Sequence, residues 1–265
     1  MVEQKYVMEG IKDVIPPEQP LFRDNEVNEI VDTLALLLDG RNAENIHIYG
    51  EKGSGKTYLL SSVSSKLLSE DPDLSVVKVD GRIHDTEYKI LRKVGNFLGG
   101  DIPESGYSLT LARDIFKKAV SESGEVILIL ENIELLLERD GDKLFYFVSR
   151  LKNKSDISLV TTSSEIKKLK KELSSRTKSS YSCNTIELRN LKTEEAFEIL
   201  NSYFKNFGLD KYVVAKSIAL SRYESNGEFI NLKIALNTLR ELVGRYKSLL
   251  MRKLLRVHIF PFSGN

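Results

Sequence analysis

The sequence has no tryptophan, one cysteine and only three histidines among its 265 residues. A single cysteine, Cys183, cannot form a disulfide within the chain or build a thiolate zinc site, and nothing beside it indicates an activated thiolate. The histidines stand at positions 47, 84 and 258 without metal-ligand spacing, so we expect them to be structural. These absences exclude disulfide-rich, zinc-binding and thiol-dependent proteins.

Long hydrophobic runs and an excess of one charge are also missing. The longest apolar runs, Leu34–Leu38 and Val126–Leu130, have five residues each, whereas about 20 are needed to cross a bilayer. The N-terminal segment Met1–Gly10 has no apolar core and carries acids, unlike a signal peptide. We therefore expect a cytoplasmic protein without a membrane partner. Its 39 basic and 38 acidic residues leave a net charge of +1, which argues against a uniformly basic nucleic-acid binder.

Short β-rich runs alternate with segments of helical period over most of the chain. The segments with helical spacing of apolar residues begin near Asp24 and continue as Thr57–Leu68, Glu87–Leu98, Leu109–Val120 and Lys143–Leu151. The predicted strands are Asn45–Tyr49, Ser75–Val79, Val126–Leu130, Ser158–Thr162 and Thr185–Leu188. This alternation predicts an α/β fold around a parallel five-stranded sheet.

The strand signal stops after Leu191. Thr193 and the two glutamates that follow it form a good helix start, and turn residues occur at Gly208 and at Asn226-Gly227. The helical runs between them are Phe197–Phe207, Tyr212–Tyr223 and Phe229–Tyr246. We therefore expect an α/β nucleotide-binding domain over residues 1–192, a small α-helical lid domain over 193–255 and a tail over 256–265.

A phosphate-binding motif follows the first predicted strand. The segment from Gly50 to Thr57 fits G-x-x-x-x-G-K-[ST] and opens a helix, which is the context that the motif requires. Backbone N–H groups of such a loop converge on phosphate oxygens at the positive end of the helix. We expect Lys56 to reach the β- and γ-phosphates of ATP or ADP and Thr57 to bind Mg²⁺. The predicted nucleotide-binding residues of this segment are Gly50, Gly53, Ser54, Gly55, Lys56, Thr57 and Tyr58.

An acid at the end of a second strand is the other requirement of a P-loop enzyme, because it holds magnesium through water. Only Val126–Leu130 ends suitably, with Glu131 and then Asn132. Glu131 is the predicted metal residue, although a solvated strand end is the competing interpretation. The amide of Asn132 cannot accept a proton at neutral pH, and losing a general base lowers a rate about 10²–10⁴-fold. Glu134 is an alternative base if the strand continues, on the same face and about 6.6 Å further along.

From about Asp13 to Arg240 the chain resembles the archaeal origin-recognition family of AAA+ replication initiators. The likeness rests on the opening segment Asp13–Glu26, on the P-loop, and on Leu173–Ser180, which is similar to the family's box VII. It implies that Arg23 and Glu26 lie beside the adenine base, and that Arg176 faces the nucleotide of a neighbouring initiator subunit.

The likeness also covers residues 79–82 and 98–106. It implies that residues 102–109 are the remnant of an insertion that presses on DNA, with a plain surface loop as the alternative.

Departures from the family pattern concern hydrolysis and length. AAA+ proteins usually carry Asp-Glu where this chain has Glu131 and Asn132. The sensor 1 asparagine is replaced by a segment in which Ser164 is the candidate, and the sensor 2 arginine by Lys233, which lacks the bidentate fork. The family normally continues into a winged-helix domain, whereas this chain stops at Asn265. We therefore expect a truncated relative with weak DNA affinity.

Two basic stretches are further candidates for DNA contact. Residues 165–178 carry six basic and two acidic side chains, and residues 240–256 carry six basic and one acidic side chain. Such clusters can collect phosphate contacts, although most charged helical stretches are simply solvated.

The leading interpretation is an ATP-binding AAA+ protein of the replication-initiator type, with Mg²⁺ as cofactor. Its nucleotide would control binding to DNA or to homologous subunits, and its hydrolysis would be slow or absent. One alternative is an active AAA+ motor or clamp-loader-like ATPase, which needs Glu131 or Glu134 to activate water. Another is a truncated decoy that pairs with full-length initiators through the Arg176 face.

Overall fold

The computed structural model describes residues 20–39, 43–151, 156–204, 211–224 and 230–242. The chain divides into two compact units, one of residues Phe22–Arg189 and one of Met1–Leu21 with Asn190–Asn265. Several sequence predictions lie outside the described residues, namely the opening segment up to residue 19, the turns at 208 and 226–227, and the tail over 256–265.

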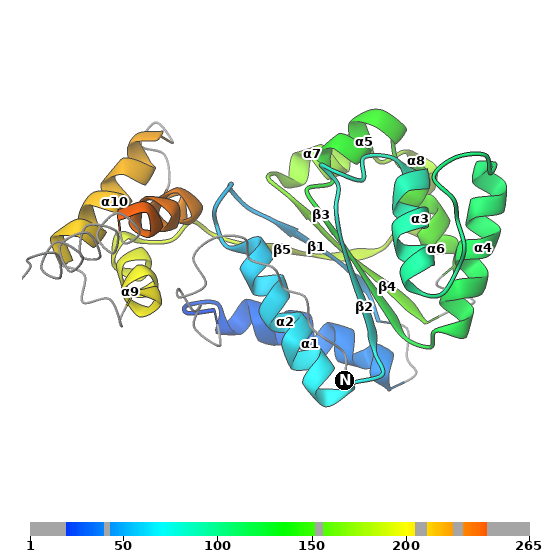
Figure 1. Ribbon diagram of the computed structural model, residues 1–265, viewed down its shortest axis with the longest axis horizontal. Coiled ribbons are helices and arrows are strands. Elements are labelled where there is room, and N and C mark those ends of the chain that lie inside the picture. The colour runs from blue at the N-terminus through cyan, green and yellow to red at the C-terminus, as the bar shows by residue number, and fades with distance from the viewer. Residues whose placement is uncertain (1–19, 40–42, 152–155, 205–210, 225–229, 243–265) are drawn as a thin grey trace, which may run out of the picture. The chain divides into compact units, whose positions relative to one another are not determined.

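The larger unit is built on a five-stranded parallel sheet with strand order β2-β3-β4-β1-β5 (Figure 1). This confirms the predicted fold class. The register pairs Asp80 with Glu131 and Tyr49 with Ser163, so the carboxyl ends of the strands meet along one edge. The strands are β1 (Asn45–Tyr49), β2 (Ser75–Asp80), β3 (Val126–Glu131), β4 (Ile157–Ser163) and β5 (Cys183–Glu187).

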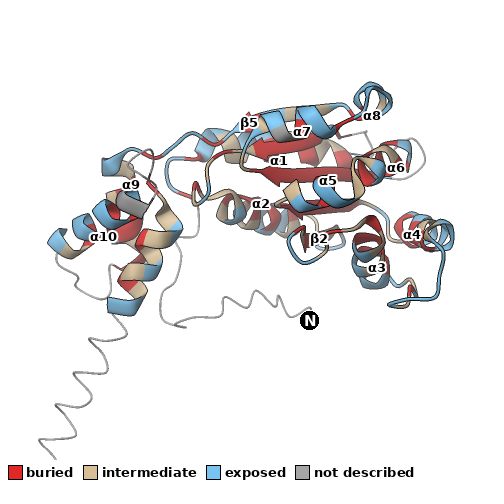
Figure 2. Cartoon of the chain, turned by 90° about the horizontal axis from the view of Figure 1, so that it is seen from above, coloured by how far each residue is buried: buried red, intermediate tan, exposed pale blue. Residues whose placement is uncertain are grey.

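Helices cover both faces of this sheet, and the alternation of side chains along β3 explains why. Ile127 and Ile129 join the core beneath α1 (Asp24–Leu38) and α2 (Lys56–Glu70). Leu128 and Leu130 point the other way, into the core shared with α3 (Glu87–Phe97), α4 (Leu109–Glu122) and α6 (Lys143–Leu151). Every residue of β3 is buried, as expected for a parallel strand covered on both faces, and Figure 2 shows the middle of the sheet in the colour of buried residues.

Three short helices were not predicted: α5 (Glu134–Asp140), α7 (Ile166–Glu172) and α8 (Ser175–Ser180). The first of them overturns the idea that β3 continues to Glu134. The strand ends at Glu131 because Asn132 adopts a left-handed backbone conformation with φ 54°, which asparagine tolerates better than most residues. Glu134 is therefore the first residue of a helix and does not lie on a strand face.

The smaller unit is helical where the structure describes it. It contains α9 (Thr193–Tyr203), α10 (Lys211–Glu224) and a helix over residues 232–242. α9 begins at Thr193, as predicted. The backbone N–H of Lys192, which precedes the helix, donates to Glu195 Oε2 at 2.9 Å, so this N–H has a hydrogen-bond partner. Leu200, Val214 and Leu239 join the three helices in one apolar core.

No helix within the described ranges has the length and apolar content that a membrane span requires.

Candidate nucleotide-binding site

The P-loop runs from the end of β1 to the start of α2, and glycine is required at two of its positions. A Cβ on Gly50 would lie 2.5 Å from the carbonyl oxygen of Leu188, so no side chain fits there. Gly55 precedes α2 with φ 98°, in the left-handed region. The loop can therefore keep its backbone curved around the helix start.

Lys56 lies inside this curve. Its Nζ donates to the carbonyl oxygens of Gly50 at 2.5 Å and Glu51 at 3.0 Å. Burial lowers the pKa of Lys56, and the negative charges of Glu134, Glu51 and Glu131 oppose that shift. The ammonium is therefore held by the loop's own carbonyl groups, in the place where the motif puts a phosphate, and the charges of the three glutamates favour its protonated form.

The other predicted residues of the loop lie around the start of α2. Ser54 is buried, Gly53 has φ 86°, and Thr57 is exposed as the second residue of the helix. Burial raises the pKa of Tyr58 to about 12, so its hydroxyl stays protonated.

Arg23 ties the start of α1 to the P-loop. It is 4% exposed, and its Nη1 donates to Glu26 Oε1 at 3.1 Å. Its Nη2 donates to the carbonyl oxygens of Arg189 at 2.7 Å and Ser54 at 3.4 Å. Both predicted base-side residues, Arg23 and Glu26, thus lie beside the P-loop, and their contact with adenine stays a prediction.

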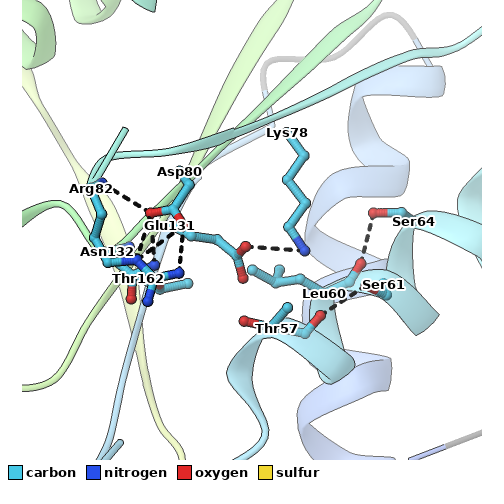
Figure 3. A network of polar contacts seen from close by, with 10 residues as sticks. All are labelled: Thr57, Leu60, Ser61, Ser64, Lys78, Asp80, Arg82, Glu131, Asn132 and Thr162. Carbon is cyan, nitrogen blue, oxygen red and sulfur yellow. Dashed lines mark hydrogen bonds and ion pairs between the residues drawn. The ribbon is translucent and has the colours of Figure 1, made fainter. Parts of the chain in front are cut away.

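Glu131 ends β3 with its carboxylate buried. Oε2 lies 3.1 Å from Lys78 Nζ, whereas Oε1 is buried and has no hydrogen-bond partner within the described structure. Figure 3 shows the carboxylate extending from the strand end toward the start of α2, where Thr57 lies. A buried, unpaired carboxylate oxygen facing a threonine fits a magnesium ion held through water, because Mg²⁺ prefers hard oxygen ligands and keeps several waters.

Lys78 was not among the predicted site residues. The sequence does contain a sign of its role, because this lysine stands between two valines in a run that otherwise has the pattern of a buried strand. In β2 the flanking Val77 and Val79 are 3% and 2% exposed.

Asn132 has its amide committed to the neighbouring strand. Its Nδ2 donates to Asp80 Oδ1 at 3.1 Å, and its backbone N–H donates to Thr162 Oγ1 at 3.1 Å. Arg82 donates to the same Asp80 carboxylate through Nε and Nη2. Burial favours a raised pKa for Asp80, yet the hydrogen bonds from Arg82 and Asn132 hold its pKa below the ordinary value. The position predicted to lack the general base thus carries an amide bonded to an ionised carboxylate (Figure 3).

Glu134 and Ser164 lie together, which the strand-based interpretation could not anticipate. Glu134 Oε1 accepts hydrogen bonds from the backbone N–H of Ser164 at 2.7 Å and from its hydroxyl at 2.9 Å. The negative charge of Glu134 also raises the pKa of Lys56, more than the charges of Glu51 and Glu131 do. The predicted sensor and the alternative base therefore form one hydrogen-bonded unit, and its negative charge acts on the P-loop lysine.

His47 on β1 is hydrogen-bonded to two side chains of β4. Its ring nitrogens lie 2.8 Å from Thr161 Oγ1 and 3.0 Å from Ser163 Oγ. Burial lowers the pKa of His47 to about 4, although the Glu134 charge opposes the shift. The ring is therefore neutral at physiological pH and serves as a hydrogen-bonding spacer between β1 and β4.

Arg176 lies on α8 and is exposed. Its Nη2 donates to the hydroxyl of Tyr146 at 2.6 Å, and its guanidinium carbon lies 4.0 Å from the centre of that ring. α8 is capped by Ser174, whose hydroxyl and N–H both donate to Asp142. Lys233 is exposed on the helix over residues 232–242 of the smaller unit.

The segment 102–109 is anchored at one end. Asn96 exchanges two hydrogen bonds with the backbone of Ile102, and the Tyr88 hydroxyl donates to the Pro103 carbonyl oxygen at 2.9 Å. Residues 104–108 are exposed. A DNA contact through this segment stays a prediction.

Comparison with known proteins identifies the class that this fold and P-loop define. A family model described as AAA domain matches residues 39–169. The chain is thus an AAA+ P-loop protein. The ORC1-type DNA replication protein 1 of Sulfurisphaera tokodaii is 31% identical over 195 residues, which are 72% of this chain and 48% of that protein. Its counterpart in Methanosarcina acetivorans is 30% identical over 57% of this chain and 38% of its own length.

Solved structures have the same fold. The Aeropyrum pernix ORC1 protein in complex with DNA matches with a TM-score of 0.77 at 24% identity, over 89% of this chain and 62% of that one. Cdc6p from Pyrobaculum aerophilum matches with a TM-score of 0.71 at 18% identity, over 88% of this chain and 64% of that one. Within the AAA+ class, these comparisons support the archaeal ORC1/Cdc6-type family. It spans about half the length, or less, of the two curated relatives described.

Proposed function

We propose that this chain binds ATP or ADP with Mg²⁺ at the P-loop, and that the bound nucleotide controls its binding to DNA or to another initiator subunit. The observation that carries the proposal is the combination of a glycine-curved P-loop, its half-buried Lys56 and the unpaired buried oxygen of Glu131. The names of the relatives, which concern DNA replication, support the choice of DNA and initiator subunits as partners. Such a role would place the protein in the cytoplasm with the chromosome.

The residues divide the work by their chemistry. The backbone of residues 53–57 and the Lys56 ammonium would bind phosphates, while Arg23 and Glu26 would lie at the base. Thr57 and Glu131 would hold magnesium, which supplies positive charge to the phosphates. Ser164 and Lys233 would sense the γ-phosphate, and Arg176 would reach the nucleotide of a neighbouring subunit.

Slow or absent hydrolysis is part of the proposal. Asn132 stands where an AAA+ protein usually has its water-activating glutamate, and its amide is already bonded to Asp80. An amide cannot accept a proton at neutral pH. A protein that binds ATP without turning it over stays long in one conformational state, which suits an initiator or an accessory subunit.

A second candidate is an active ATPase, and the position of Glu134 favours it. Its carboxylate is held by Ser164, and its negative charge acts on Lys56 of the P-loop, so it would be the group that orients a water molecule. Turnover of about 1 s⁻¹ or faster, a typical lower value for enzymes, and its loss in the E134Q variant would favour this candidate.

Two binding measurements test the leading proposal. ATP and ADP binding are measured by calorimetry on wild type, on K56A and on the matched control K66A, an exposed lysine further along α2. Duplex DNA binding is then measured by fluorescence anisotropy with ATP, with ADP and without nucleotide. We expect K56A alone to lose nucleotide binding by at least about tenfold, or about 1.4 kcal/mol, and to lose the nucleotide effect on DNA. Equal ATP affinity in all three proteins would refute the P-loop assignment.

A further inference from the structure

A lysine is paired with the very carboxylate that is proposed to hold magnesium. Lys78 Nζ lies 3.1 Å from Glu131 Oε2, and the Glu131 side chain is 7% exposed. The Lys78 side chain is 31% exposed, so it is partly in contact with solvent. Only one of the two carboxylate oxygens is engaged, because Oε1 has no hydrogen-bond partner in the described structure.

The position of Lys78 in the sheet holds this pair in place. Lys78 lies on β2, where its neighbours Val77 and Val79 are buried in the core. β2 pairs in parallel register with β3, and Lys78 lies opposite Ile129, two residues before Glu131. The backbone on both sides is therefore fixed, and the four-carbon stem of the lysine spans the distance along the strand.

An ammonium paired with this carboxylate changes the charge that a metal ion encounters at Glu131. The ammonium and Mg²⁺ are both cations that seek the same negative charge, so each weakens the attraction of Glu131 for the other. An ammonium at the site also supplies positive charge near the phosphates when no metal is bound.

We propose that Lys78 competes with magnesium for Glu131, so that this chain holds its nucleotide with a weak dependence on magnesium. The inference rests on the proposed nucleotide binding. Without the metal, Lys78 neutralises Glu131, so the carboxylate repels the phosphates of the nucleotide less. When magnesium binds, the Lys78 ammonium leaves Glu131 and moves toward solvent. Because the metal must displace the ammonium, a higher magnesium concentration is needed to occupy the site.

The test measures binding of a fluorescent ATP analogue while magnesium is titrated into protein freed of metal with EDTA. The variant K78M removes the charge and keeps most of the apolar stem, and K78Q is a second variant of the same kind. K78R keeps the charge, and K66M on the exposed face of α2 is the matched control. Circular dichroism melts verify that each variant is folded.

We expect the magnesium concentration at half-effect to fall by about tenfold in K78M and K78Q, which corresponds to about 1.4 kcal/mol. Their metal-free affinity for the nucleotide should fall below that of wild type, because Glu131 then faces the phosphates unpaired. K78R and K66M should behave as wild type. Folded K78M and K78Q proteins with the wild-type magnesium midpoint would overturn the inference and leave a purely structural ion pair. A wild type that binds no nucleotide in either condition would instead refute the proposed function and this inference with it.

Discussion

The variant N132E tests whether the missing carboxylate at the end of β3 is what limits hydrolysis. It puts a glutamate at the position next to Glu131, where wild type has an amide bonded to Asp80 at 3.1 Å. The new carboxylate loses that hydrogen bond and faces Asp80, which Arg82 continues to hold through its own hydrogen bonds. A general base is gained at the expense of one polar contact.

The size of the effect follows from two opposing terms. A positioned general base accelerates a reaction by about 10²–10⁴-fold. The backbone at position 132 has φ 54°, and a residue other than glycine, asparagine or aspartate loses about 1–2 kcal/mol there. Since about 1.4 kcal/mol is a factor of ten, we expect N132E to hydrolyse ATP at least about tenfold faster than wild type.

The assay is single-turnover hydrolysis of radiolabelled ATP with Mg²⁺ at protein in excess over nucleotide. N132Q is the matched control, because glutamine has the length and the backbone cost of glutamate without its basicity. The double variant D80N/N132E exchanges the carboxylate and the amide, restores a hydrogen bond between the two positions, and should be at least as fast as N132E.

Two results would refute the reasoning. Wild type that turns over freely would show that Asn132 does not limit hydrolysis and would favour the Glu134 ATPase. Folded, ATP-binding N132E that is no faster than N132Q would show that a base at this position has no access to the attacking water.

Three further predictions concern stability. R113M should lower the free energy of unfolding by about 3–5 kcal/mol, because it leaves the Glu87 carboxylate, which is 1% exposed, without its bidentate partner. In urea unfolding, the double variant E87M/R113M should be closer to wild type than R113M is. If R113M loses less stability than the double variant, the prediction is wrong. G81A should cost about 1–3 kcal/mol, since its Cβ would lie 2.6 Å from the Asn132 carbonyl oxygen; an unchanged melting temperature would be the contrary result. The pKa of His47 is lowered to about 4, so the unfolded state binds the extra proton first and stability falls as pH drops from about 6.5 toward 4, by about 3 kcal/mol. H47Q should lack that part of the slope when the two proteins are compared by urea unfolding across this range, and identical slopes would exclude it.

The sheet and the P-loop were predictable from the sequence for a simple reason. Strands covered on both faces read as short apolar runs, and the ends of all five predicted strands lie within two residues of the observed ones. The P-loop needs only local spacing, so a motif reveals it. The helix α7, with four lysines in seven residues, has too little apolar periodicity to be recognised.

The polar pairs of the site could not be predicted, because they depend on which strand ends are neighbours. Asp80 meets Asn132 only because β2 lies beside β3. Glu134 meets Ser164 only because the chain turns at Asn132 and comes beside the end of β4. The sequence alone determines neither the strand order nor the left-handed conformation of Asn132. Glu134 was therefore placed on a continued strand, whereas it begins the helix α5.

Arg23 has a consequence for how the two ends of the larger unit communicate. Its Nη2 donates both to Ser54 in the phosphate-binding loop, at 3.4 Å, and to Arg189, at 2.7 Å. Arg189 is the last residue before the chain enters the smaller unit. Because the guanidinium is planar and rigid, one nitrogen of the same group bonds both carbonyl oxygens at once. A single side chain thereby connects the phosphate-binding loop to the residue at which the helical segment is attached.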